Sequence, residues 1–222
     1  MRHIVKQKTP KALKTYQSTP NATYEGFQGK DGLRLVLIKE QKGLCAYCNG
    51  RISNSWDSIL KKYKTEIEHY KSQELHPHLQ LDFTNMLGVC NGNAGKPPSL
   101  LHCDKGRPEK STLIITPLSK NCENLIKYDS DGTIYSDDMD IHKDLDKILN
   151  LNVAHLKHNR RSTLEDVINR MKRFFPKKKG ESWTKSEIKN EMKFWETIDE
   201  DKNLNPYCQI AIFYLQNKLK RL

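Results

Sequence analysis

Residues 65–69 read Thr-Glu-Ile-Glu-His and residues 85–90 read Asn-Met-Leu-Gly-Val-Cys. The first run alternates around a β-branched isoleucine, and the second is an apolar run of strand length. Residues 70–84 between them contain Pro77 flanked by two histidines, which is typical of an irregular loop. The sequence therefore predicts a β-hairpin, with His69 at the end of its first strand and Cys90 at the end of its second.

A helix is expected upstream of this hairpin. Leu33, Val36 and Leu37 recur at helical spacing, and Gly43 is placed to end the helix just before Cys45.

Four cysteines flank the hairpin at spacings that suit one metal ion: Cys45, Cys48, Cys90 and Cys103. The first two form a C-x-x-C pair, in which two thiolates can converge on a tetrahedral ion. Thioredoxin-type redox chemistry would require a βαβ setting, which this region lacks. A second alternative is that Cys90 and Cys103 are ordinary buried thiols. The spacing favours a structural zinc site, and Cys122 and Cys208 are expected to be unliganded core or surface thiols.

The composition indicates a polyanionic partner. The chain has 222 residues and a formal net charge of +11, with basic residues gathered in residues 1–30 and at Lys177, Lys178 and Lys179. A merely soluble basic surface is the alternative, but basic residues near both termini favour nucleic acid, DNA or RNA.

The sequence shows no sign of membrane insertion. It has no apolar N-terminal segment of the signal-peptide type and no run of about eighteen apolar residues. We therefore expect a cytoplasmic protein, in whose reducing compartment closely spaced cysteines are metal ligands before they are disulfides.

Several polar residues between the cysteines could hydrolyse a phosphodiester. Such a site needs a base for water, a divalent ion against the developing charge and a group that orients the base. His69, the pair Glu68 and Asp104, and Asn85 can fill these roles in that order. Each alone has a plainer explanation, since His69 could be a structural histidine or a zinc ligand and Asn85 a turn residue.

The order of these motifs resembles the HNH nuclease signature, in which a ββα hairpin and helix hold one catalytic metal. More closely, residues 40–52, the runs at 67–69, 81–93 and 102–106, and Leu-Asn-Leu-Asn at 149–152 look like the PtuB-type HNH proteins of Septu and retron-associated anti-phage defence. The resemblance covers residues 33–161 in motif-sized pieces. It implies a nuclease effector that works with PtuA, an ATPase of the ABC/SMC type, sometimes alongside a reverse transcriptase and its RNA–DNA product.

Residue by residue, the resemblance implies that His69 is the base, that Asn85 orients it and that Glu68 contacts the catalytic Mg²⁺ or Mn²⁺. Asp104 matches the second ligand of that ion if a helix begins at Cys103. Asn91, directly after Cys90, is the rival ligand.

These observations together predict an α+β protein in three parts. Residues 1–30 would form a basic arm of extended chain or short turns, and residues 31–112 a zinc-stapled HNH core. Residues 113–222 would contain a small β extension, with strands near 113–115, 124–128 and 133–135, and then a helical C-terminal region.

Two rivals to this endonuclease remain. A non-catalytic zinc module that binds nucleic acid or protein would need the cysteines but neither His69 nor Asn85. A stand-alone, restriction-like HNH nuclease would act without an ATPase. The C-terminal aromatics bear on the second rival, because they would either bury a docked partner or simply pack the domain; they are Trp183, Phe194, Trp195 and Phe213.

Overall fold

The predicted hairpin is present at the centre of an α+β chain. The computed structural model describes residues 1–59, 61–108 and 110–222. Strand β3 (Thr65–His69) pairs antiparallel with β4 (Met86–Cys90), in a register that sets Thr65 opposite Cys90 and His69 opposite Met86. Asn85 lies just before β4, in a 3₁₀ turn (Phe83–Asn85).

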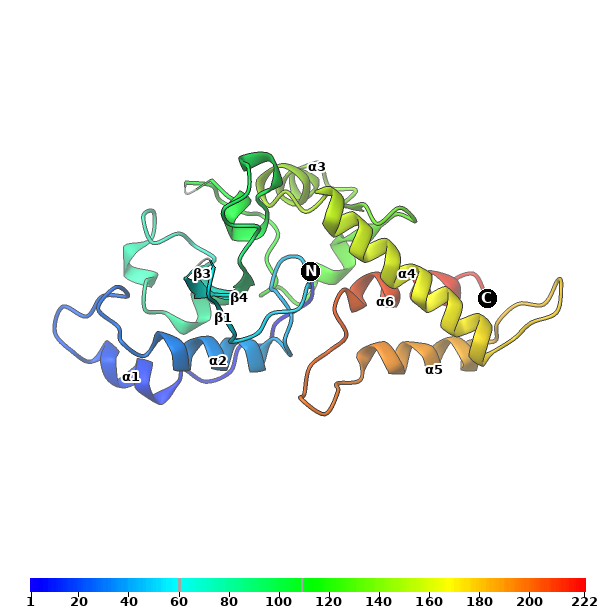
Figure 1. Cartoon of the computed structure of the whole chain (residues 1–222), viewed down its shortest axis with the longest axis horizontal. Coiled ribbons are helices and arrows are strands. Elements are labelled where there is room, and N and C mark those ends of the chain that lie inside the picture. The colour runs from blue at the N-terminus through cyan, green and yellow to red at the C-terminus, as the bar shows by residue number, and fades with distance from the viewer. Residues whose placement is uncertain (60, 109) are drawn as a thin grey trace.

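Helix α2 (Lys30–Glu40) packs along this hairpin, as Figure 1 shows in blue and cyan. Its Leu33 and Leu37 are buried with Phe83 and Met86. Beyond the helix, Gly43 has a φ of +71°, a left-handed conformation that turns the chain into the cysteine pair.

The N-terminal segment contains a helix besides the extended chain and short turns expected from its weak periodicity. It contains helix α1 (Lys11–Gln17), whose Leu13 is fully buried against the same core. Nearer the start, Met1 and Ile4 are buried in the central core, and Lys6 binds the Glu40 carboxylate at 2.6 Å. Because these buried residues are isolated along the sequence, no periodic pattern predicts their burial.

Two further hairpins are short. β1 (Trp56–Asp57) pairs with β2 (Lys62–Tyr63), and β5 (Lys127–Tyr128) pairs with β6 (Ile134–Tyr135) in the predicted β extension.

The strand expected at residues 113–115 does not form, which corrects the sequence-based assignment. Instead of pairing with a strand, the backbone N–H groups of Ile114 and Ile115 donate to the buried carboxylate of Asp144, at 2.5 and 3.0 Å. A side chain thirty residues away therefore satisfies the backbone groups that a sheet would have used.

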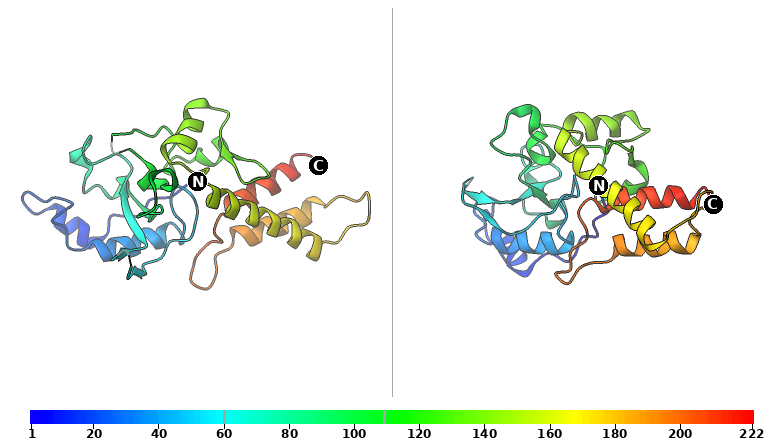
Figure 2. Two further views of the ribbon diagram at one scale, coloured as in Figure 1. Left: turned by 45° about the horizontal axis from the view of Figure 1, so that its top comes forward. Right: turned by 45° about the vertical axis from the view of Figure 1, so that its right-hand side comes forward.

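The C-terminal region is helical, as predicted. Figures 1 and 2 show its long helix crossing from the central part of the molecule to the far end, where the last two helices pack beside it. The elements are α3 (Met139–Lys143), a π-helical turn (Asp144–Ile148), α4 (Ala154–Phe174), α5 (Lys185–Glu196) and α6 (Cys208–Leu219).

The aromatic residues of this region mostly pack the domain itself. Trp195 is buried and Trp183 lies partly buried against the same cluster. Phe213 contacts the Tyr128 ring, and the more exposed Phe194 is covered by the Arg170 guanidinium at 3.5 Å. A docking role for them thus has no support in their packing.

Short 3₁₀ turns connect the remaining elements; besides the one before β4, they are Pro77–Leu79, Pro98–Leu100, Cys103–Gly106 and Cys122–Leu125. Among the described residues, no helix has the length and apolarity needed to cross a bilayer.

Candidate functional site

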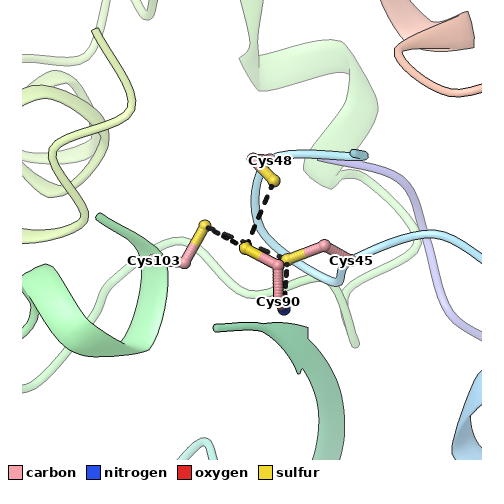
Figure 3. A group of neighbouring side chains, drawn as sticks. All are labelled: Cys45, Cys48, Cys90 and Cys103. Carbon is pink, nitrogen blue, oxygen red and sulfur yellow. Dashed lines mark hydrogen bonds between the residues drawn. The ribbon is translucent and has the colours of Figure 1, made fainter. Parts of the chain in front are cut away.

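The four predicted cysteines converge on one point between three separate segments (Figure 3). Their sulfur atoms all lie within 4.8 Å of one another. Cys45 Sγ lies 3.9 Å from Cys103 Sγ, Cys48 Sγ 3.9 Å from Cys90 Sγ, and Cys90 Sγ 3.7 Å from Cys103 Sγ. The cysteines are therefore not joined as disulfides, which would bring two sulfurs to about 2.05 Å.

These separations fit a tetrahedral thiolate site. Zinc–sulfur bonds of about 2.3 Å place the sulfurs of a regular tetrahedron about 3.8 Å apart. Burial raises the pKa of the Cys45 thiol, but hydrogen bonds from the three other cysteines outweigh it and lower that pKa well below its usual value. A thiolate is thus favoured at Cys45, whereas burial and the neighbouring cysteines raise the pKa values of Cys90 and Cys103. The positions of the four sulfurs show that the cluster could hold an ion such as zinc.

Local backbone conformations shape the cysteine cluster. The turn around Cys45 and Cys48 is closed by Asn49 in the left-handed region, at a φ of 59°, and the N–H of Gly50 donates to Cys48 Sγ at 3.3 Å. The buried Gln41 side chain bonds to both backbone groups of Gly88, which ties this turn to β4.

Cys103 is brought to the cluster from the far side of a loop. Its N–H donates to the Leu149 carbonyl at 2.8 Å, and its own φ is +56°. Asn150 donates from its side chain to the carbonyls of Ser99 and Leu101. Residues 149–152, noted above in the sequence, thereby fasten the loop that carries Cys103.

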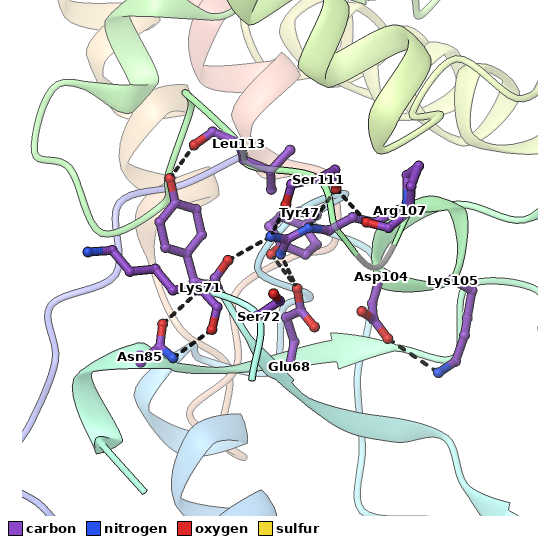
Figure 4. A network of polar contacts seen from close by, with 12 residues as sticks. Tyr47, Glu68, Lys71, Ser72, Asn85, Asp104, Lys105, Arg107, Ser111 and Leu113 are labelled. Carbon is purple, nitrogen blue, oxygen red and sulfur yellow. Dashed lines mark hydrogen bonds and ion pairs between the residues drawn. The ribbon is translucent and has the colours of Figure 1, made fainter. Parts of the chain in front are cut away.

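Glu68 and Asp104 line one cavity of about 280 Å³ beside the cysteine cluster. Glu68 comes from the end of β3 and Asp104 from the 3₁₀ turn that begins at Cys103. Figure 4 shows the two carboxyl groups on the same side of the hairpin. The helix expected to begin at Cys103 is only a four-residue 3₁₀ turn, shorter than the helix of a ββα motif, and it carries Asp104.

Glu68 is 7% exposed and tightly surrounded. Arg107 pairs with its Oε1 at 2.6 Å, and the Tyr47 hydroxyl donates to the same oxygen at 3.0 Å. The pKa of Glu68 is raised well above its usual value, first by burial and then by hydrogen bonding and charge repulsion with Asp104; Arg107 and Tyr47 offset this only in part. A divalent cation between the two carboxylates would relieve that repulsion.

The donor set fits a hard ion that keeps most of its own water. Within the described ranges, the cysteine cluster is the only group of three or more histidine, cysteine or acidic side chains close enough to share a metal. Glu68 and Asp104 would thus be two ligands, and Mg²⁺ commonly binds through one or two carboxylates together with water and substrate phosphate.

His69 opens on the same cavity and its ring is held in place. Its Nε2 lies 2.8 Å from the Gln80 carbonyl, and the Tyr24 ring packs edge-on against it at 4.5 Å between centroids. With Nε2 donating to that carbonyl, Nδ1 is left as an acceptor. Burial lowers the pKa of His69, with the Gln80 carbonyl and Asp104 opposing, so the neutral ring is favoured.

Asn85 acts on the loop that follows β3. Its Oδ1 accepts from the Lys71 N–H at 2.8 Å, while its Nδ2 donates to the carbonyls of Lys71 and Leu79 at 3.0 and 3.4 Å. The bond that orients the His69 ring comes from Gln80, next to Leu79 in the same loop. Asn85 can therefore position His69 only through the backbone between them.

The structure distinguishes the two rival ligands by position. Asp104 lines the cavity with Glu68 and His69, whereas Asn91 is not among its lining residues. Lys105 binds Asp104 at 3.3 Å and Glu66 at 2.5 Å at the cavity rim.

Three groups at this site escaped the sequence analysis. Arg107 joins Glu68 to the backbone of Tyr70 and Ser111, and Tyr47 lies inside the C-x-x-C pair. Gln80 contributes its backbone carbonyl to His69, and its side-chain Oε1 accepts from the Tyr24 N–H. A backbone carbonyl leaves no signal in a sequence. Tyr47 could have been found from the sequence, because a residue between two ligand cysteines must lie next to the metal site.

No protein-family model matches the chain, and a comparison with curated proteins also finds no match. Function must therefore be inferred from the geometry of this site.

Proposed function

We propose that this protein is a metal-dependent endonuclease of the HNH type, with a structural zinc ion on its four cysteines. The observation that carries the proposal is a buried histidine, held through Nε2 and favoured as the neutral ring, that shares a cavity with two facing carboxylates. A non-catalytic zinc module that binds nucleic acid or protein would need neither the oriented neutral histidine nor the two carboxylates.

His69 would accept a proton at Nδ1 from the attacking water, while the Gln80 carbonyl holds the ring and favours the imidazolium as it forms. Glu68 and Asp104 would hold Mg²⁺ or Mn²⁺. When bound, that ion supplies positive charge against the scissile phosphate and the leaving oxygen.

Arg107 and Tyr47 would keep Glu68 in position for this task. Arg107 has a 5% exposed side chain and also donates to the backbone carbonyls of Tyr70 and Ser111, so its charge acts on Glu68 and not on solvent. Its bonds fix the carboxylate before any ion or substrate arrives, which lowers the cost of ordering the site.

We also propose that the nuclease serves anti-phage defence together with a PtuA-type ATPase, as the sequence resemblance implies, with a retron reverse transcriptase and its product as a further partner. Support comes from residues 149–152, a part of the resemblance outside the hairpin, because they fasten the cysteine loop. Co-expression with a PtuA-type ATPase followed by co-purification tests the partnership.

The carboxylates should set the response to the divalent ion. Glu68→Gln and Asp104→Asn should each raise the Mn²⁺ concentration for half-maximal cleavage by on the order of tenfold or more, because each removes a charged ligand. The measurement is the cleavage rate of a labelled oligonucleotide over a Mn²⁺ titration.

Glu74→Gln is the matched control, since Glu74 lines the same cavity but is partly exposed and pairs with Lys110 at its rim. It should shift the Mn²⁺ response by less than about twofold. A normal response in Asp104→Asn together with a weakened one in Asn91→Ala would reassign the second ligand to Asn91.

The pH dependence of the cleavage rate should reflect a histidine base that stays neutral at a lower pH than an ordinary histidine. His69 works only when deprotonated, and burial lowers its pKa from the ordinary 6.5. Single-turnover cleavage at saturating Mn²⁺ should therefore rise through an apparent pKa below 6.5 and be level from about pH 7 upward. An apparent pKa above 7 would contradict the lowered pKa of His69 and would mean that another group sets the pH response.

A further inference from the structure

A second groove, of about 420 Å³, adjoins the cavity just described. Its walls come from α2, the β1–β2 hairpin and the outer side of β3, and they combine aromatic with basic side chains. The aromatic and basic residues that line it are Tyr24, Arg34, Trp56, Lys61, Tyr63 and Lys105.

Trp56 is the unusual member of this groove, because 54% of its surface is exposed. Ile59, in the same hairpin, is 89% exposed. Exposing two large apolar side chains to water does not stabilise so short a hairpin. Their exposure on one hairpin therefore points to a ligand that covers them.

The Trp56 ring is held in place by contacts with neighbouring side chains. Tyr63 packs edge-on against it at 5.2 Å between centroids, and the Tyr63 hydroxyl donates to Asp31 at 2.7 Å. Arg34 lies over the Tyr63 ring at 3.9 Å and bonds to both Asp31 and the Thr65 carbonyl. These contacts anchor the hairpin to α2 and β3, so the aromatic surface is formed before any ligand binds.

The groove runs directly into the candidate active site. Glu66, Ile67 and Lys105 line both spaces. Tyr24 lines the aromatic groove and also contacts the His69 ring. A chain bound at His69 can therefore continue along β3 to Trp56 without leaving the protein surface.

An exposed aromatic ring flanked by cations is the combination that binds unpaired nucleotides, with bases stacked on the ring and phosphates beside the lysines. Arg34, Lys61 and Lys105 supply the cations here. Arg34 also pairs with Asp31, and Lys105 also pairs with Glu66 and Asp104. A paired base offers only its edge to such a ring, since both of its faces are already stacked in the duplex.

We infer that this aromatic groove is a substrate subsite that takes an unpaired nucleotide of the strand that carries the scissile phosphate, with its base stacked on Trp56. The substrate class is thus nucleic acid with a single-stranded segment, such as a loop, an end or a flipped base. This inference rests on the proposed nuclease function, because it places the scissile phosphate at His69.

Binding is the direct test. Fluorescein-labelled oligothymidylate and oligouridylate of about twelve nucleotides, and a duplex of the same length, are titrated with the protein without added divalent ions, so that binding is measured apart from cleavage. Trp56→Ala should raise the Kd for the single strands about tenfold or more, and that for the duplex less than about threefold.

Two variants separate stacking from folding. Trp56→Phe keeps a ring and should stay within about threefold of the parent Kd, while the tryptophan quenching caused by oligothymidylate should disappear. Phe174→Ala is the matched control, because Phe174 is 53% exposed but lies at the end of α4. It should change the single-strand Kd by less than about twofold.

Failure of this inference differs from failure of the nuclease proposal. If Trp56→Ala binds single strands as the parent does, or loses duplex binding equally, the groove is not a stacking subsite, even where the parent cleaves. If the parent with Mn²⁺ hydrolyses neither nucleic acid nor bis(p-nitrophenyl) phosphate, the nuclease proposal is wrong, whatever the binding measurements show. With both correct, Trp56→Ala hydrolyses the small phosphodiester normally, since that substrate has no base to stack.

Discussion

His69→Ala should lower the cleavage rate at saturating Mn²⁺ by about a hundred- to ten-thousandfold, the range expected for loss of a general base. The water would then have to lose its proton to solvent, and added metal should not restore the rate, because the missing group is not a ligand. Single-turnover cleavage of a labelled oligonucleotide measures the effect.

The same change has a structural cost that must be separated from the chemical one. It leaves the Gln80 carbonyl without its ring partner and removes the contact with Tyr24. His69→Gln provides a side-chain donor near that carbonyl but no base of comparable strength, so it should be as inactive as His69→Ala while melting closer to the parent.

His78→Ala is the matched control. His78 is an exposed histidine in the loop after β3, and its removal should leave the rate within about twofold. A His69→Ala protein that is folded, free of contaminating nuclease and as active as the parent would refute the HNH mechanism, and the zinc-dependent binding module would replace it.

Local patterns predicted the parts of the site that depend on neighbouring residues. Residues 65–69 form the strand that their alternating sequence predicts, although its end buries both Glu68 and His69. The pair at Cys45 and Cys48 is set by one turn. The β5–β6 hairpin and the last three long helices were likewise predicted from turn residues and helical spacing. These features involve contacts within a few residues, which a sequence displays directly.

The meeting of Glu68 with Asp104 could not be predicted in the same way. It requires Cys103 to reach the cysteine cluster, and that position depends on the backbone of Leu149 and on the side chain of Asn150. These partners lie more than forty residues downstream. The sequence marked residues 149–152 as a motif, yet only the structure shows what they fasten.

The two errors in the fold have a common physical cause. Residues 1–30 were read as an arm and residues 113–115 as a strand, each from its own composition. In the structure a distant buried side chain decides both: Glu40 holds Lys6, and Asp144 takes the backbone N–H groups of Ile114 and Ile115. Tertiary contacts of this kind override local propensity.

Loss of zinc should have the broadest effect of any change to this protein. The cysteine cluster joins the turn after α2, the end of β4 and the 3₁₀ turn that carries Asp104. Structural zinc sites contribute on the order of 10–16 kcal/mol, comparable to the whole stability of a domain at about 5–15 kcal/mol. Cys45→Ser or Cys103→Ser should therefore lower the yield of folded protein sharply, and not the activity alone.

The control for this prediction is Cys122→Ser, because Cys122 is as fully buried as Cys45 but lies outside the cluster. It should retain one zinc ion per chain by metal analysis and lose only the modest stability of a buried polar substitution. His69→Ala should likewise retain the zinc, which separates the scaffold from the chemistry. A folded Cys45→Ser protein that carries no zinc and melts at the parent temperature would show that the sulfurs lie close without a structural ion. The position of Asp104 beside Glu68 would then have to depend on Leu149 and Asn150 alone.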